Sequence, residues 1–282
     1  MQVSVFDERN CVLGEGLLWH PLRHQLFWFD IKGRTLLSRD QNQELEWQFD
    51  RHVSAAGWVN ETELLIASER DLCLFDIETG QQTTLIALEA DNPDTRSNDG
   101  RADPWGGFVI GTMGKQAEAG AGAIYRYYQG ELRQLFSDIT ISNAICFAPD
   151  QPLLYFTDTA TQKIQRVRLD EHGWPAGEAE TFIDLTAEGL NPDGAVIDAS
   201  GCMWNAQWGA SRIAKYSPDG QFLEAVSFPA EQISCPAFGG ADLNILFATS
   251  ASDGITSPSP DEGRTYHLQT LCYGQPEHQI IL

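Results

Sequence analysis

The chain between Asn191 and Gly220 alternates short apolar runs with turn-forming residues. One apolar run covers 195–197, a second surrounds Trp204, and a third alternates apolar and polar positions over 212–216. Gly, Pro, Asp and Ser separate these runs and close the segment. Apolar runs of this length between such turns predict three short β-strands in an antiparallel meander.

The same order of features recurs along the whole chain. Each repeat has a polar residue, an apolar run, a turn with Pro or Gly, an aromatic-rich run, another turn and an alternating run. The repeats start about 42 to 50 residues apart, which is the spacing of propeller blades built from four short strands. Their starts lie near Gly14, Ala56, Asn98, Asn143, Asp193 and Cys235.

Helical periodicity is nearly absent from the sequence. We therefore predict an all-β fold, a six-bladed β-propeller, formed by a single domain over residues 1–282. A closed ring leaves no long edge strand exposed, so we also expect a monomer. The segment before Gly14 and the tail after Leu271 can complete one blade between them. The last repeat carries an insertion over 250–263, which we expect to be a surface loop.

Composition and charge narrow the range of partners. Hydrophobic residues make up 42% of the chain and charged residues 21%, which is the composition of a globular protein with a large core. Eighteen basic residues against forty acidic ones give a net charge of −22. Such a surface repels nucleic acid and anionic membranes, so we expect neither as a partner. The sequence shows no signal-peptide pattern and no membrane-length apolar stretch, which favours a soluble cytoplasmic protein.

Patterns that would indicate several other catalytic classes are missing. The six cysteines are scattered without a CxxC motif, so a cysteine zinc site or catalytic thiol has little support. The six histidines show neither HxH nor HExxH spacing. No GxSxG motif suggests a serine hydrolase, and no glycine-rich loop suggests phosphate binding.

In four of the six repeats, the same position carries an oxygen-bearing side chain. Because the innermost strand of each blade lines the axial channel, equivalent positions are expected to converge there. Two carboxylates buried together need a cation, and oxygen ligands suit a hard divalent ion such as Ca²⁺, Mg²⁺ or Mn²⁺ and permit Zn²⁺ or Fe²⁺. Asp and Asn beside Gly are also ordinary turn formers, so each residue alone has a purely structural explanation. Counting six residues back from Pro21, Pro104, Pro149 and Ala199 gives Glu15, Asn98, Asn143 and Asp193.

Two further residues are candidates for the wall of this site. Arg96 lies two positions before Asn98, so on a strand both side chains point to the same side of the chain. A cation there can bind a substrate oxygen or an oxyanion, although pairing with Asp94 or Asp99 at the surface explains an arginine equally well. Trp208 precedes a glycine at a predicted strand end and can form a pocket wall.

Five separate stretches, in order and over nearly the whole length, carry a family resemblance. They are GEGLLWHP, RSNDGRADPWGGFVIGTM, ISNAICFAPDQPLLYFTDT, NPDGAVIDASGCMWNAQWG and CPAFGGADLNILFATSA. These stretches resemble the gluconolactonase and regucalcin family, also called the SMP-30 family. This resemblance implies a six-bladed propeller with one catalytic divalent metal in the axial channel. The family's Glu, Asn and Asp ligands match Glu15, Asn143 and Asp193.

The resemblance also implies substrate contacts. The family's Arg and Asn match Arg96 and Asn98. A further Glu contacts substrate in some members a few residues after the GTM motif, and Gln116 occupies that spacing here, with Glu118 two residues later. A second departure is Ala144, because the family usually has Gly after the metal-binding Asn; we expect this change to be tolerated.

The activity that the resemblance implies is metal-assisted hydrolysis of a sugar lactone to the aldonic acid. The metal, one of Ca²⁺, Zn²⁺, Mn²⁺ or Fe²⁺, would act as Lewis acid on the lactone carbonyl and lower the pKa of a bound water. Asp193 would be both a ligand and the general base, since a carboxylate beside a dication stays ionised at neutral pH.

Two other functions remain open from the sequence. Related propellers use a similar metal cradle in phosphotriester or organophosphate hydrolases, although such sites favour a more apolar mouth than the pair Arg96 and Asn98 provides. A non-catalytic calcium-binding protein of the regucalcin type would bind metal tightly without turning over an ester.

Overall fold

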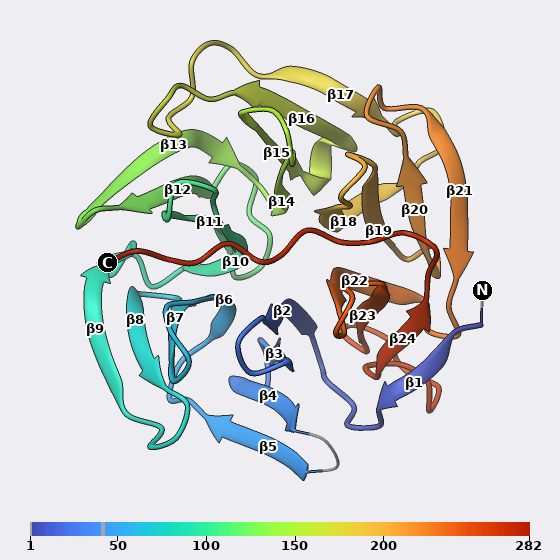
Figure 1. The fold of residues 1–282 in the computed structure, drawn as a ribbon, viewed down its shortest axis with the longest axis horizontal. Helices are drawn as coiled ribbons and strands as arrows, with labels where there is room; N and C mark the ends of the chain where they lie inside the picture. The colour runs from blue at the N-terminus through green and yellow to red at the C-terminus, as the bar shows by residue number, and fades with distance from the viewer. Residues whose placement is uncertain (1, 41–42) are drawn as a thin grey trace.

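Twenty-four strands and one short 3₁₀ helix account for the regular structure of the described residues, 2–40 and 43–282, in this computed structural model. In that part of the chain the strands form six four-stranded antiparallel sheets, which Figure 1 shows arranged as a ring. The predicted all-β, six-bladed β-propeller is confirmed. The described residues include no helix that is long and apolar enough to cross a membrane.

Consecutive strands build each of the first three blades from the axial channel outward. Blade 1 consists of β2 (Gly14–His20), β3 (Gln25–Asp30), β4 (Thr35–Asp40) and β5 (Gln43–Gln48). Blade 2 consists of β6 (Val53–Trp58), β7 (Glu63–Ser68), β8 (Asp71–Asp76) and β9 (Gln82–Ala87). Blade 3 consists of β10 (Thr95–Ala102), β11 (Phe108–Gly114), β12 (Gly122–Tyr128) and β13 (Glu131–Ile139).

The remaining blades follow the same plan, except that the last takes its outermost strand from the N-terminus. Blade 4 consists of β14 (Ser142–Phe147), β15 (Leu153–Asp158), β16 (Lys163–Arg168) and β17 (Glu180–Asp184), with the 3₁₀ helix η1 (Thr159–Thr161) between β15 and β16. Blade 5 consists of β18 (Asn191–Ile197), β19 (Met203–Trp208), β20 (Arg212–Tyr216) and β21 (Phe222–Ser227). Blade 6 consists of β22 (Gln232–Gly239), β23 (Ile245–Ala251), β24 (Thr265–Gln269) and β1 (Ser4–Asp7).

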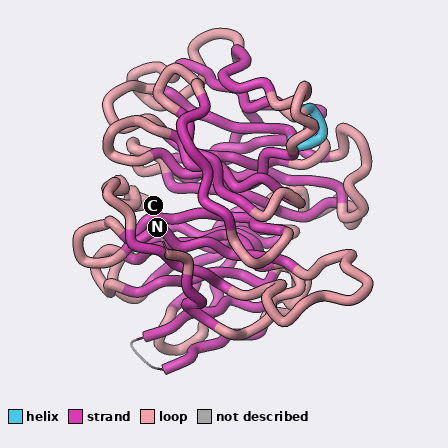
Figure 2. Tube along the Cα trace, turned by 90° about the vertical axis from the view of Figure 1, so that its right-hand side faces the viewer, coloured by secondary structure: helices cyan, strands magenta, loops and turns pink. Residues whose placement is uncertain are grey.

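Burial changes from the inner to the outer strand of a blade and explains the hydrophobic pattern. Every residue of β2 is buried, and β14 is buried along its whole length. The outermost strands β5 and β13 are mostly exposed or half-buried. An inner strand packs between neighbouring blades on both faces and therefore reads as a continuous apolar run, whereas an outer strand meets water. Figure 2 shows the strands running through the body of the molecule and loops at its edges.

Each innermost strand has one irregularity in its pairing with the second strand of its blade. A bulge of this kind disrupts the ladder locally and re-aims side chains, and bulges are frequent beside active sites. Here they occur at a similar depth in every blade, where the chain borders the axial channel. The register shifts lie between Glu15 and Leu18, Val53 and Ala55, Ser97 and Gly100, Asn143 and Cys146, Pro192 and Ala195, and Ile233 and Pro236.

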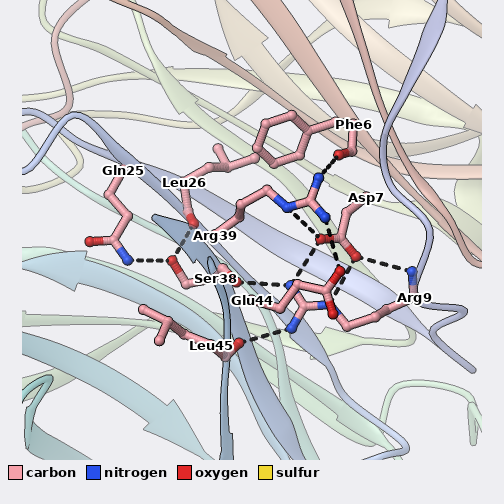
Figure 3. Close-up of polar contacts among 9 residues, drawn as sticks. All are labelled: Phe6, Asp7, Arg9, Gln25, Leu26, Ser38, Arg39, Glu44 and Leu45. Carbon is pink, nitrogen blue, oxygen red and sulfur yellow. Dashed lines mark hydrogen bonds and ion pairs between the residues drawn. The ribbon is translucent and has the colours of Figure 1, made fainter. Parts of the chain in front are cut away.

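The N-terminus closes the ring. Strand β1 pairs with β24 and completes blade 6, and the Arg9 guanidinium that follows it reaches into blade 1. Arg9 donates to the carbonyl oxygens of Ser38 at 2.8 Å and Leu45 at 2.9 Å and pairs with Asp7 (Figure 3). Arg39 of blade 1 donates in return to the carbonyl oxygen of Phe6 at 2.7 Å. These contacts fasten the last blade to the first.

The C-terminal tail does not complete a blade, so the prediction that both termini share this task is half wrong. Among the described residues the tail forms no strand of a blade sheet; instead it crosses one face of the ring (Figure 1). We call residues 273–281 the C-terminal strap. Its backbone bonds to blades 5, 2 and 3 through Ala199 N to Tyr273 O at 2.8 Å, Ile280 N to Trp58 O at 2.9 Å and Ile281 N to Gly106 O at 2.8 Å.

The insertion in the last repeat is a loop, as expected. Its first two residues, 250 and 251, belong to β23; the rest connects β23 to β24 without regular structure, and most of its side chains are exposed or half-buried. Near its start, Asp253 pairs with Lys32 of blade 1, whose Nζ lies 2.7 Å from a carboxylate oxygen. The loop therefore bridges the last blade and the first.

Candidate active site

A cavity of about 350 Å³ lies at the N-terminal ends of the innermost strands. The four side chains that the repeat phase selected all line it, each from a different blade. Arg96, Gln116 and Trp208 also line this cavity. The four residues are Glu15 on β2, Asn98 on β10, Asn143 on β14 and Asp193 on β18.

Two of the carboxylates that line the cavity, Glu15 and Asp193, are buried without an ion-pair partner among the described residues. Glu15 is 5% exposed and Asp193 is 4% exposed. Within the described residues neither forms an ion pair, and the Glu15 carboxylate accepts only the amide of Gly16, at 3.3 Å. Burial raises the pKa of Glu15 to about 8, with a further contribution from the charge of Asp99. Burial and then the charge of Glu15 raise the pKa of Asp193 well above its usual range.

This donor set fits a divalent cation. Two ionised carboxylates held together in a protein interior require a compensating positive charge. The described residues contain no group of three His, Cys, Asp or Glu side chains arranged to hold a metal. A site here would therefore combine the carboxylates of Glu15 and Asp193 with a neutral oxygen, and the Asn143 amide lines the same cavity. Hard oxygen donors of this kind match Ca²⁺ and other hard divalent ions.

A chain of hydrogen bonds runs along the cavity wall from Arg96 through Asn98 to Asn143. Arg96 Nη1 donates to Asn98 Oδ1 at 2.7 Å, and Asn98 Nδ2 donates to Asn143 Oδ1 at 3.0 Å. Asn98 Nδ2 also donates to the carbonyl oxygen of Ser142 at 2.8 Å, which fixes the orientation of its amide. Both hydrogens of the Asn98 amide are thus bonded within the protein, to residues of blade 4.

Arg96 is a buried cavity residue rather than a surface arginine. It is 7% exposed, and beyond Asn98 its guanidinium donates to the carbonyl oxygen of Ser97 at 2.9 Å. Burial lowers the pKa of Arg96 to about 10, and the Glu15 carboxylate partly offsets that effect. The alternative of a surface pair with Asp94 or Asp99 does not describe this side chain.

The loop after β11 brings Gln116, but not Glu118, to the cavity. Gln116 lines the wall, whereas within the described chain Glu118 lies outside the lining. The Glu118 carboxylate accepts from the backbone N–H of Gln116 at 3.0 Å. Lys115 also lines the cavity, and its Nζ lies 2.9 Å from Glu69 of blade 2. The same Glu69 oxygen is 2.6 Å from His52 Nδ1, so the loop is anchored to the neighbouring blade.

Sequence reasoning missed four polar residues that line the cavity: Lys32, Lys115, Thr159 and Asp253. They lie on turns and loops, where no strand period assigns a direction to a side chain. It considered Asp99, which follows Asn98 in the SNDG stretch, only as a surface partner of Arg96. Asp99 is buried and accepts the amide of Ile145 at 2.7 Å, and burial raises its pKa to about 6.

Comparisons with known proteins agree with this architecture. The family model described as SMP-30/Gluconolactonase/LRE-like region matches residues 13–252. An L-arabinolactonase of Azospirillum brasilense is 33% identical over 280 residues, covering 95% of this chain and 91% of that protein. A 6-deoxy-6-sulfogluconolactonase of Pseudomonas putida is 32% identical over 245 residues, covering 86% of this chain and 84% of that protein.

A solved structure shares both sequence and fold with the chain. It is a calcium-binding protein, regucalcin, from Agrobacterium tumefaciens, with 39% identity and a TM-score of 0.96, covering 99% of this chain and 97% of that one. The family match spans most of the propeller, and the relatives are similar over nearly their whole lengths. The chain belongs to the SMP-30/gluconolactonase/LRE-like family.

Proposed function

We propose that the protein is a metal-dependent sugar lactonase, a hydrolase that opens an aldonolactone to the aldonic acid. The observation that carries this proposal is the pair of buried carboxylates, Glu15 and Asp193, which face one cavity without a cationic side chain bound to either within the described chain. Relatives named L-arabinolactonase and 6-deoxy-6-sulfogluconolactonase support a sugar lactone as the substrate class.

Glu15, Asn143 and Asp193 would hold one divalent cation, which is Ca²⁺, Zn²⁺, Mn²⁺ or Fe²⁺. Their two carboxylates and one amide oxygen lie on three different innermost strands and line the same cavity. When bound, the cation supplies Lewis-acid polarisation of the lactone carbonyl. Its positive charge would also offset the burial and the charge of Glu15, which raise the pKa of Asp193.

Asp193 acts as the general base. Its carboxylate lines the cavity, where it can accept a proton from the water that attacks the lactone carbonyl. Arg96 is bonded through Nη1 to neutral oxygens of Asn98 and Ser97, so its positive charge stays available to a developing oxyanion or a sugar hydroxyl. These groups come from blades 5 and 3 and line the same cavity.

Substrate hydroxyls would be held by Arg96, Asn98 and Gln116. All three line the cavity, whose volume of about 350 Å³ suits a small ring rather than a polymer. A polar wall of this kind favours a polyol over a phosphotriester, which would need a more apolar mouth. Glu118 would not touch the substrate. Its carboxylate would instead position Gln116, through the hydrogen bond that it accepts from the backbone N–H of Gln116.

The experiment measures acid release from glucono-, galactono-, xylono- and arabinonolactone by metal-stripped protein, with single divalent ions added back. We expect at least one lactone to be opened faster than it hydrolyses spontaneously, only when an ion is present. Asp193→Asn should lower this turnover by about 10³-fold, since both a ligand and the base are lost. Circular dichroism checks that the variant is folded.

A calcium-binding role without catalysis is the second candidate, because the regucalcin of Agrobacterium tumefaciens is described as a calcium-binding protein. It predicts Ca²⁺ binding by calorimetry together with no lactone turnover under any ion. That result would overturn the lactonase proposal and leave the cation site in place. Turnover of a phosphotriester with no lactone opened would favour the hydrolase alternative instead.

A further inference from the structure

We propose that Thr159 is a positioning residue that turns the Asn143 side-chain oxygen toward the cavity. The inference rests on the proposed function, because the oxygen matters as a donor to the proposed cation. Thr159 opens η1, the short 3₁₀ helix that Figure 2 shows in cyan at the right-hand edge of the molecule, and it lines the cavity.

The hydroxyl of Thr159 has a fixed direction of hydrogen bonding. Its Oγ1 lies 2.7 Å from the carbonyl oxygen of Pro192, which can only accept, so the hydroxyl hydrogen is committed there. Its oxygen must therefore accept the second bond, which comes from Asn143 Nδ2 at 2.9 Å. The amide oxygen of Asn143 is consequently turned away from Thr159.

The other side of the Asn143 amide is fixed in the same sense. Its Oδ1 accepts from Asn98 Nδ2 at 3.0 Å, and Asn98 is itself oriented by the carbonyl oxygen of Ser142. An amide oxygen has two acceptor positions, so one remains for a ligand in the cavity. A reversed Asn143 amide would place its NH₂ against the NH₂ of Asn98, and its oxygen against the oxygen of Thr159, whose hydrogen is committed to Pro192.

The position of Thr159 is itself well determined. The carboxylate of Asp158, the residue before it, caps η1 by accepting from Ala160 N at 3.2 Å and also accepts from Ile141 N at 3.0 Å. The bond from Thr159 to Pro192 joins blade 4 to the residue next to Asp193 on β18. The Thr159 hydroxyl thus links the side chain of Asn143 to the backbone beside Asp193.

Loss of the hydroxyl leaves the buried Nδ2 of Asn143 without its acceptor. Asn143 is 3% exposed, so this nitrogen has little access to water. The amide then has no orientation in which both ends are bonded, and presentation of its oxygen to the cavity is no longer favoured. Loss of such an outer partner typically weakens metal binding by about 10- to 100-fold.

The test compares Thr159→Val, Thr159→Ser and Thr161→Val in the full chain. Val keeps the shape of Thr without the hydroxyl, and Ser keeps the hydroxyl. Thr161 is the matched control because it lies in the same 3₁₀ turn and its hydroxyl donates to the carbonyl of Asp158 at 2.7 Å, away from Asn143. Calorimetric titration of metal-stripped protein with Ca²⁺ and with Mn²⁺ gives the dissociation constants.

We expect Thr159→Val to weaken binding of at least one ion by about 10-fold or more, with Thr159→Ser and Thr161→Val within about 3-fold of wild type. Equal affinities of wild type and a folded Thr159→Val would overturn the role of Thr159 and leave the lactonase proposal intact. Should Thr159→Val not fold, Thr159→Ala takes its place with the same criteria. Absence of ion binding in the wild type would overturn both proposals.

Discussion

The two ends of the axial channel hold charged side chains in different ways. At the N-terminal ends of the innermost strands, Glu15 and Asp193 face the cavity, and in the described chain neither forms an ion pair. At the C-terminal ends, Arg101 of β10 lies 2.6 Å from Glu277 of the C-terminal strap, with their side chains 12% and 8% exposed. The unpaired carboxylates lower the stability of the fold until a cation binds. The charge of Arg101, in contrast, is already balanced by a carboxylate of the same protein.

Strand β10 shows the contrast within a few residues. Arg96, near its beginning, bonds to the neutral oxygens of Asn98 and Ser97. Arg101, near its end, bonds to the carboxylate of Glu277. Charged side chains at the cavity end are therefore available to a ligand, whereas at the end covered by the C-terminal strap they stabilise the fold.

Packing at the strapped end depends on small residues. Ile280 of the strap is 1% exposed, and a Cβ added to Gly57 would lie 2.4 Å from its Cδ1. Ile281 occupies the space beside Gly106 in the same way. Gln275 Nε2 donates to the carbonyl oxygens of Phe147 at 3.1 Å and Ile197 at 3.0 Å, which ties blades 4 and 5 together. The strap therefore closes this end with apolar and polar contacts at once.

The largest effect on stability is expected at the strapped end. Glu277→Ala leaves the Arg101 guanidinium buried without its carboxylate, which should lower the free energy of unfolding by about 3 kcal/mol. Glu277→Gln, which keeps a hydrogen-bond acceptor, should cost less. Urea denaturation of metal-saturated protein measures both, and lactone turnover below the transition should stay near wild type. Loss of turnover in folded Glu277→Ala would show that the two ends are not independent.

Metal removal tests the cavity end by its dependence on pH. The pKa of Glu15 is raised to about 8 in the fold, above the value of about 4.3 expected for the unfolded chain. A raised carboxyl pKa contributes stability at low pH that is lost as pH rises through the interval between the two values. Metal-free protein should therefore lose stability from about pH 5 to pH 8, and an ion at 100 times its Kd should restore about 2.7 kcal/mol at pH 8.

A matched variant separates the site from the many other carboxylates of the chain. Asp193→Asn removes the second charge next to Glu15, so the stability of this metal-free variant should fall less steeply over the same pH interval. Thermal melts at several pH values, with and without Ca²⁺ or Mn²⁺, provide the comparison. Identical slopes for the wild type and Asp193→Asn would contradict the mutual repulsion of the two carboxylates.

The repeat made the strand-borne part of the site predictable. Glu15, Asn143 and Asp193 each occupy one position relative to a turn, and each innermost strand carries its bulge at the same depth. The repeat therefore predicted that these three side chains point into the axial channel. The loop residues Thr159 and Asp253 could not be found in this way, because a loop has no period that fixes a side chain.

The C-terminal strap was unpredictable for a related reason. Its contacts join residues separated by much of the sequence, such as Trp58 and Ile280. Pro276 and the absence of an alternating run could have argued against a strand in the tail, whereas the β-branched Val5 and aromatic Phe6 are compatible with β1. The direction of the Asn143 amide likewise depends on Thr159, which sequence spacing alone does not place beside it.

The smallest predicted effect concerns the backbone beneath the site. Ala144 follows Asn143 at the bulge of β14 with φ 55°, and Gly16 follows Glu15 at the bulge of β2 with φ 58°. A non-glycine residue in this left-handed region costs about 1–2 kcal/mol. Ala144→Gly removes that strain but loses a buried methyl group, worth about 0.8 kcal/mol, and gains backbone entropy in the unfolded chain, worth about 0.5–1 kcal/mol.

These terms nearly cancel, so Ala144→Gly should change the free energy of unfolding by less than about 1 kcal/mol and leave the ion affinity unchanged. Ala144→Val is the contrasting variant, since a β-branched residue tolerates a positive φ poorly and this position is fully buried. Urea denaturation and calorimetric titration measure the two variants together. A glycine variant that is more stable yet binds the ion more weakly would show that the strained backbone helps to place Asn143. The backbone at the cavity end, like its unpaired carboxylates, would then lower the stability of the fold in favour of ion binding.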